Sequence, residues 1–291
     1  AVQVQQALQV TGTSEVWEFG AGTGALALQL LDSLGDAVAR YTIIDLSGSL
    51  RARQADTLAP HAHKVRWLDA WPEVIEGVVV GNEVLDAMPV QLLQRTGGVW
   101  HERGVVSEGD AFAWEDRPTD LRPPMAIEGE HDYLTEIHPQ GEAFIASLAE
   151  RLQAGRGGAA FFLDYGFPEA EYFHPQRHMG TVMCHQLHQA DADPLVAVGQ
   201  KDITAHVNFT GVALAAQNAG LHVLGYTSQA WFLLNLGLAE RMAEASLAER
   251  SQAQRLVNEH EMGELFKVIG LATSGDWAAQ GFDRGDRSHR L

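Results

Sequence analysis

A glycine-rich turn is the clearest chemical signal in the sequence. The segment 18–24 (EFGAGTG) follows a short apolar run and precedes a helical pattern. Its glycines, Gly20, Gly22 and Gly24, allow positive φ and close approach of a ligand to the backbone. The helix that follows offers free N–H groups to an anion. The spacing G-x-G-x-G differs from the dinucleotide fingerprint G-x-G-x-x-G, and no Gly-Lys-Ser/Thr follows. A tight connection without any ligand is the alternative interpretation.

Acidic residues follow the next two strand signals. Asp45 ends the second predicted strand, where a carboxylate can accept hydrogen bonds from both hydroxyls of a ribose. The alternative role for Asp45 is to cap the helix that follows. Asp69 comes just after the third predicted strand and could equally begin a turn before Trp71-Pro72.

Three polar side chains follow the fourth predicted strand. Asn82, Glu83 and Asp86 are expected at the carboxyl edge of the sheet, where doubly wound folds place their ligands. The alternative for Glu83 and Asp86 is helix capping, because acidic residues favour the first turn of a helix.

Further candidates lie in the second half of the chain. Asp164-Tyr165-Gly166 follows the fifth predicted strand, and a substrate-binding role and a simple turn are both open. Cys184 and several histidines raise the question of zinc, but no C-x-x-C or H-E-x-x-H pattern is present. Neighbours in a strand point to opposite faces, which separates Cys184 from His185. We therefore expect no metal, and polar contacts around an active-site mouth instead. The histidines considered are His174, His178, His185, His188 and His206; Asn208 is the expected N-cap of the next helix.

Alternating strand and helix signals predict the elements that position these residues. Short, nearly continuous apolar runs favour strands buried on both faces, joined by helices in a doubly wound sheet. The prediction is an α/β fold with a Rossmann-like, seven-stranded, mostly parallel sheet. A single domain is expected over residues 1–291, with antiparallel and helical insertions at about 91–137, 169–200 and 229–260. The expected core strands are 15–19, 40–45, 64–68, 78–81, 159–164, 221–226 and 267–273; the expected helices are 25–34, 48–58, 141–154, 210–219 and 229–260.

Composition excludes some classes of partner. The 291 residues include 38 Asp and Glu against 20 Lys and Arg, a formal net charge of −18. A binder of nucleic acid or of an anionic membrane needs a basic face, so neither partner is expected. A single cysteine excludes an internal disulfide framework and suits a reducing compartment. We expect a bacterial cytoplasmic protein, or a mitochondrial matrix protein if the source is eukaryotic.

Several segments, in order along the chain, resemble the MidA-like class I S-adenosylmethionine-dependent methyltransferases, whose mitochondrial members are complex I assembly factors that methylate a protein arginine. The resembling segments are 18–27 (EFGAGTGALA), 81–90 (GNEVLDAMPV), 164–168 (DYGFP), 171–185 (EYFHPQRHMGTVMCH), 202–209 (DITAHVNF) and 261–268 (EMGELFKV). Family members carry a longer N-terminal region, which helps to cover the cofactor. A truncated chain would bind cofactor less well.

The resemblance implies a binding site for S-adenosylmethionine. The residues expected to bind it are Glu18, Gly20, Ala21, Gly22, Gly24, Asp45, Leu46 and Asp69. The glycine turn would hold the methionine end, Glu18 the amino group or a water, and Asp69 the adenine amino group.

The resemblance also implies a protein arginine as methyl acceptor. Arginine stays protonated in solution and binds carboxylates in a bidentate fork. Glu83 is therefore the hypothesis for a catalytic clamp, with Asp86 as second candidate and Asn82 to orient either group. Asp164, Tyr165, His178, His185 and His206 are the expected substrate contacts. Alternatives are methylation of a small molecule or of another side chain, and a cofactor-binding assembly factor with little turnover.

Overall fold

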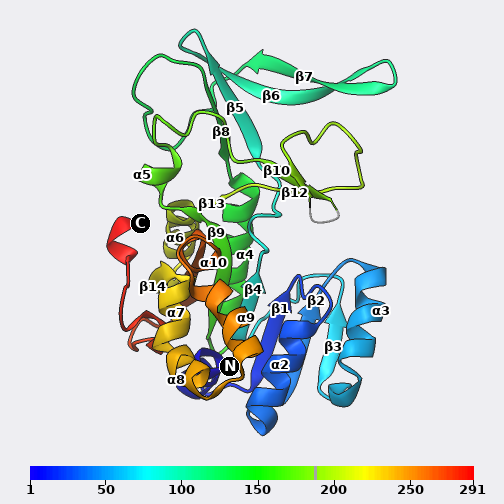
Figure 1. Cartoon of the computed structure of the whole chain (residues 1–291), viewed down its shortest axis with the longest axis vertical. Coiled ribbons are helices and arrows are strands. Elements are labelled where there is room, and N and C mark those ends of the chain that lie inside the picture. The colour runs from blue at the N-terminus through cyan, green and yellow to red at the C-terminus, as the bar shows by residue number, and fades with distance from the viewer. Residues whose placement is uncertain (187–188) are drawn as a thin grey trace. The chain divides into compact units, whose positions relative to one another are not determined.

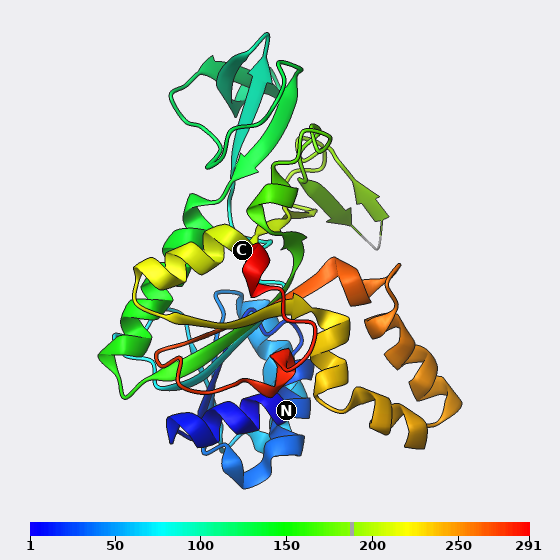
Figure 2. The same cartoon turned by 90° about the vertical axis from the view of Figure 1, so that its left-hand side faces the viewer.

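The computed structural model describes residues 1–186 and 189–291. Contacts divide the chain into two compact units, shown in Figure 1 and, turned by a quarter, in Figure 2. The first unit comprises 1–84, 145–165 and 213–290, and the second comprises 85–144 and 166–212, with Leu291. Two of the expected insertions, 91–137 and 169–200, fall largely in the second unit. The organisation as a single domain stays a prediction.

The first unit is built on the predicted sheet. Within the described residues, its strand order is β14-β15-β9-β4-β1-β2-β3. The strands from β9 to β3 pair in parallel, and β15 runs antiparallel to both of its neighbours. The prediction of a mostly parallel sheet with these seven strands is confirmed, and the short strand β13 (Val207–Asn208), which pairs with β9, adds an eighth. The strands are β1 (Glu15–Phe19), β2 (Arg40–Ile44), β3 (Val65–Leu68), β4 (Gly77–Asn82), β9 (Gly158–Phe167), β14 (His222–Ser228) and β15 (Phe266–Ala272).

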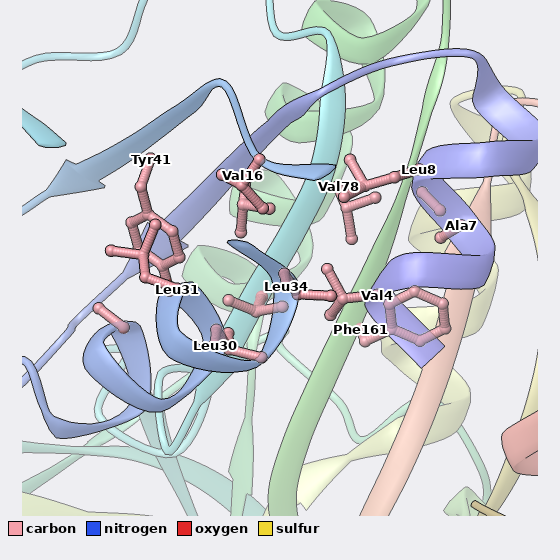
Figure 3. Close-up of a cluster of buried hydrophobic side chains, with 14 of the residues drawn as sticks. Val4, Ala7, Leu8, Val16, Leu30, Leu31, Leu34, Tyr41, Val78 and Phe161 are labelled. Atoms are coloured by element: carbon pink, nitrogen blue, oxygen red, sulfur yellow. The ribbon is translucent and has the colours of Figure 1, made fainter. Parts of the chain in front are cut away.

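The core of the first unit forms where two helices cover one face of this sheet. Figure 3 shows Val4 and Leu8 of α1 (Val2–Thr11) and Leu30, Leu31 and Leu34 of α2 (Ala25–Leu34) directed at strand side chains. Spacings of three and four residues place these apolar side chains on one helical face. The facing strand residues include Val16, Tyr41, Val78 and Phe161, all buried. This packing fixes the strands whose carboxyl ends carry the candidate site.

Other helices of the first unit follow the sequence pattern closely. The helical signal over 229–260 is confirmed as three successive helices. None of the helices in the described chain is long and apolar enough to span a bilayer. Gly220, with φ 85°, follows the end of α6 (Phe209–Asn218) in the left-handed conformation that glycine favours there. The remaining helices are α3 (Gly48–Thr57), α4 (Pro139–Ala154), α6 (Phe209–Asn218), α7 (Gln229–Asn235), α8 (Leu238–Glu244), α9 (Leu247–Val257) and α10 (Met262–Leu265), with α4 and α6 shared between the units.

The second unit contains the antiparallel segments. Four strands within the expected insertion 91–137 form a separate sheet of order β7-β6-β5-β8, and all of its pairs are antiparallel, as predicted. A three-stranded sheet of order β11-β10-β12 was not predicted at all. The strands are β5 (Gln91–Thr96), β6 (Val99–Glu108), β7 (Ala111–Pro118), β8 (Tyr133–Ile137), β10 (Met183–Gln186), β11 (Gln189–Asp191) and β12 (Asp202–Thr204); β13 (Val207–Asn208) pairs with the end of β9, and α5 is Glu169–Tyr172.

Candidate functional site

The glycine turn has the backbone geometry that its spacing predicts. Gly20, Gly22 and Gly24 have φ of 63°, 53° and 83°, a region that side chains rarely adopt. Gly24 is also the N-cap residue of α2, so the turn leads directly into a helix N-terminus. A Cβ added at Gly22 would meet no atom within 4 Å, whereas one at Gly20 would lie 3.3 Å from Val84. The turn thus packs closely against Val84 at Gly20, and it leaves free space next to Gly22.

Glu18, at the end of β1, is a buried carboxyl group. It is 2% exposed, and its Oε2 accepts a 2.7 Å hydrogen bond from the hydroxyl of the buried Tyr41. Burial raises the pKa of Glu18 to about 7, against the opposing effect of the Tyr41 hydrogen bond. Ionisation of Glu18 therefore requires more free energy in the folded protein than in water.

This burial predicts a pH dependence of stability. Glu18 binds its proton more tightly in the folded than in the unfolded chain, where its pKa is near 4.5. The protonated Glu18 carboxyl therefore contributes fully to the free energy of unfolding below pH 4.5. This contribution is lost as the pH rises through about 7, and the loss is roughly 3 kcal/mol. Measured by urea unfolding, the free energy of Glu18→Gln relative to wild type is expected to rise over this window. A difference that stays constant between pH 4.5 and 8 would contradict the assignment.

Asp45, directly after β2, is held in a hydrogen-bond network that the sequence did not predict. Its Oδ2 accepts from Gln54 Nε2 at 2.7 Å, and its Oδ1 accepts from Ser47 N at 2.8 Å. The same Gln54 nitrogen donates to the Gly22 carbonyl at 3.0 Å, and Gln54 Oε1 accepts from Trp67 Nε1 at 2.9 Å. Gln54, buried on α3, thereby ties the glycine turn to the carboxylate. The sequence carries no signal for this role, because α3 is mostly polar and Gln54 is its one buried residue.

The alternative role of Asp45 as a helix cap is wrong. Ser47 is the N-cap of α3, and its side chain accepts from Leu50 N. Two further predicted residues lie at this edge. Leu46 is 83% exposed, an apolar side chain presented beside Asp45, and Asp69 is exposed in the loop after β3. A flat apolar ligand group would find contact with Leu46 here.

Glu83 has an unusual backbone at the end of β4. Its φ is 53°, and it is one of two non-glycine residues with positive φ in the described chain. Its N–H donates to the Leu163 carbonyl at 2.9 Å, and its exposed carboxylate accepts from Asn82 Nδ2 at 3.0 Å. A side chain in this region costs free energy that the surroundings must offset, and such strain clusters at functional sites.

Helix capping by Glu83 or Asp86 is wrong, because no helix begins between β4 and β5. The chain continues through turns to β5. Asp86 is 3% exposed and belongs to the second unit, where its carbonyl accepts from Ala205 N at 2.9 Å. The first unit therefore brings together Asn82 and Glu83 with the glycine turn at one sheet edge, and Asp86 belongs to the second unit.

Asp164 and Tyr165 lie inside β9 and not in a turn after it. Asp164 is fully buried, with its Oδ1 accepting from Tyr165 N at 3.0 Å, and it lies opposite Lys267 of β15. Strand pairing continues through Gly166 and Phe167, which pair with β13. A Cβ at Gly166 would lie only 2.0 Å from the Val207 carbonyl, so this close approach requires glycine. The turn interpretation is wrong for this reason, and substrate binding by either residue stays a prediction.

The three predicted histidines belong to the second unit. His178 is exposed and makes an edge contact with His131, and His206 makes one with Phe167. His185 is exposed on β10 while Cys184 is buried, as strand alternation predicts. Among the described residues, no three His, Cys, Asp or Glu side chains are grouped to hold a metal. His188 lies outside the described residues, and Asn208 caps α6 by accepting from Gly211 N.

Comparison with known proteins identifies similar sequences. Residues 1–227 match the model of the Methyltransf_28 family, described as S-adenosyl-L-methionine-dependent methyltransferases. The chain is 26% identical over 296 residues to the protein arginine methyltransferase NDUFAF7 of Danio rerio, covering 87% of this chain and 68% of that protein. It is 28% identical over 300 residues to the Drosophila melanogaster homologue, covering 87% and 66%. The chain thus spans about two thirds of the length of these relatives.

Two crystal structures from Burkholderia thailandensis are similar over the whole chain. One covers 99% of this chain and 82% of that chain, with 48% identity and a TM-score of 0.93. The other, bound to S-adenosyl-homocysteine, covers 100% and 79%, with 48% identity and a TM-score of 0.92.

Proposed function

The chain belongs to the Methyltransf_28 family of S-adenosyl-L-methionine-dependent methyltransferases, and from this premise we propose that it methylates an arginine side chain of a protein. The observation that carries the proposal is the exposed carboxylate of Glu83, held with Asn82 at the carboxyl edge of the sheet. The curated relatives named as protein arginine methyltransferases support it.

The residues at this edge suit the cofactor. S-adenosyl-L-methionine supplies a methyl group on a positively charged sulfur. The open space beside Gly22 admits a ligand to the backbone, and Asp45, oriented by Gln54, offers carboxylate oxygens to two ribose hydroxyls. Leu46 offers an apolar surface to the adenine, and Asp69 a carboxylate to its amino group. Glu18 offers a carboxylate to the cationic amino group, directly or through a water.

Glu83 would act on the acceptor. A guanidinium presents a planar fork of N–H donors that matches a carboxylate, so Glu83 can orient one nitrogen towards the methyl group. Orientation of the two reactants alone lowers the barrier by several kcal/mol. The negative charge also holds protons on the nitrogens that it binds, which leaves electron density on the reacting nitrogen. That nitrogen would release one proton to solvent as it takes the methyl group, so the product side chain keeps a single positive charge. Asn82 holds the Glu83 carboxylate through its amide N–H.

A labelling experiment tests the proposal. The protein is incubated with S-adenosyl-L-methionine labelled in the methyl group and with extract of its source cells, and the proteins are hydrolysed to amino acids. Label in methylarginine is the expected result. Label in small metabolites or in another amino acid would favour the second candidate acceptor, and cofactor binding without any transfer would favour an assembly factor.

The cellular compartment of the chain depends on the organism that it comes from. The curated relatives are named as mitochondrial proteins. We infer the bacterial cytoplasm for this chain if its source is bacterial, and the mitochondrial matrix if it is eukaryotic. Fractionation of source cells with an antibody against the chain tests this.

A further inference from the structure

An apolar groove lies within the second unit. It has a volume of about 570 Å³ and is lined by residues 86–92, by the β6–β7 hairpin, by Val182 and by residues between 194 and 205. All of its lining residues belong to this unit. Its apolar side chains include Leu92, Val105, Phe112, Trp114, Leu195 and Ile203.

The hairpin presents three apolar side chains to this groove, Val105, Phe112 and Trp114, which together form the hairpin stripe. Val105 of β6 pairs directly with Trp114 of β7, and Ser107 pairs with Phe112 at the next position on the same face. Val105 is 51%, Phe112 49% and Trp114 39% exposed, and Ile203 of β12 is 45% exposed. Large apolar side chains gathered around a concavity, and not scattered singly, indicate an interaction surface.

Charge indicates the kind of partner. The second unit carries seventeen Asp and Glu against six Lys and Arg, a net charge of −11 out of −18 for the whole chain. Asp86 and Glu102 supply carboxylates to the groove lining. Arg103, the only Lys or Arg among the described lining residues, is bound by both oxygens of Asp116 at 2.8 Å. The field in the groove therefore favours a cationic partner and disfavours a second, equally acidic copy of the chain.

We propose that the apolar groove docks the segment of the protein substrate that flanks the methylated arginine, with apolar side chains against the hairpin stripe and positive net charge. The proposal rests on the proposed function, which provides a cationic protein as substrate. In the sequence, the groove lining begins at Asp86, three residues after Glu83.

A peptide selection tests the docking surface without requiring methyl transfer. The full chain, saturated with S-adenosyl-homocysteine, selects from a synthetic peptide library in which a fixed arginine is flanked by randomised positions. We expect enrichment of apolar and basic residues over acidic ones at the flanks. Val105→Ser and Trp114→Ser should each reduce binding of the enriched peptides by about tenfold, since each removes one apolar contact.

Val99→Ser is the matched control. Val99 lies on the same strand, is 54% exposed and does not line the groove. It should bind the enriched peptides as wild type does. Enrichment of acidic flanks, absence of enrichment, or equal binding by the Val99 and Val105 variants would overturn the proposal. So would a concentration-dependent dimer that dissociates on Val105→Ser, because a second copy would then occupy the groove.

Failure of the groove and failure of the proposed function give different results. If labelled methylarginine forms in extract at equal rates with wild type and Val105→Ser, the docking surface is refuted and the function stands. If peptide selection depends on Val105 and Trp114 but no arginine is methylated, the docking surface stands and the acceptor is another group.

Discussion

Glu83→Gln is expected to lower the rate of methyl transfer by about 100-fold or more while leaving the affinity for S-adenosyl-homocysteine nearly unchanged. Glutamine keeps the shape of the side chain and can still contact Asn82, but it removes the negative charge that would hold the acceptor guanidinium. The measurement is single-turnover transfer to the methylated protein of the source extract, together with calorimetric titration of the cofactor product. Unaltered turnover would remove Glu83 from the mechanism.

The backbone of Glu83 supplies a control for this experiment. Because φ is 53°, Glu83→Gly relieves conformational strain and is expected to leave the protein at least as stable as Glu83→Gln. Both variants should be equally inactive if the carboxylate is what matters. A glycine variant that retained activity would show that the backbone conformation, and not the carboxylate, is the functional feature of this position.

Asp45→Ala is expected to weaken binding of S-adenosyl-homocysteine by about 100-fold. Two hydrogen bonds from ribose hydroxyls to a charged acceptor contribute about 1.5 kcal/mol each, and about 3 kcal/mol corresponds to that factor. Calorimetric titration measures the affinity. Asp56→Ala, at an exposed carboxylate on the same helix as Gln54, is the matched control and should bind as wild type does. Equal affinities for the two variants would contradict the ribose assignment.

Gln54→Leu separates orientation of Asp45 from its charge. Leucine is similar in size but donates nothing to Asp45 or to the Gly22 carbonyl, so the carboxylate keeps its charge and loses its positioning. We expect a loss of cofactor affinity smaller than that of Asp45→Ala, about tenfold. An affinity equal to that of wild type would show that the network is structural only.

The parts of the fold that depend on local signals could be predicted from the sequence. The bounds of β1 and α2 are those that the hydrophobic patterns and the glycines predict. The positive φ values of Gly20, Gly22 and Gly24 follow from a spacing that is complete within seven residues. These features need no information from distant parts of the chain.

The parts of the structure that depend on contacts between distant residues could not be predicted from the sequence. Glu83 is fixed by a hydrogen bond to Leu163, a residue of a strand that begins 75 positions later in the sequence. The turn that the sequence allows at Gly166 is wrong, because the close approach of Val207 makes this residue a strand glycine. Gln54 has no motif, and its role is visible only where α3, the glycine turn and Asp45 meet.

A crystal structure of the protein with S-adenosyl-homocysteine tests the central claim most directly. We predict that both ribose hydroxyls lie within hydrogen-bonding distance of the Asp45 carboxylate, that the amino acid end lies along the turn of Gly20 to Gly24, and that the sulfur faces Glu83. A ligand bound elsewhere, or a sulfur turned away from Glu83 towards a different carboxylate, would contradict the account.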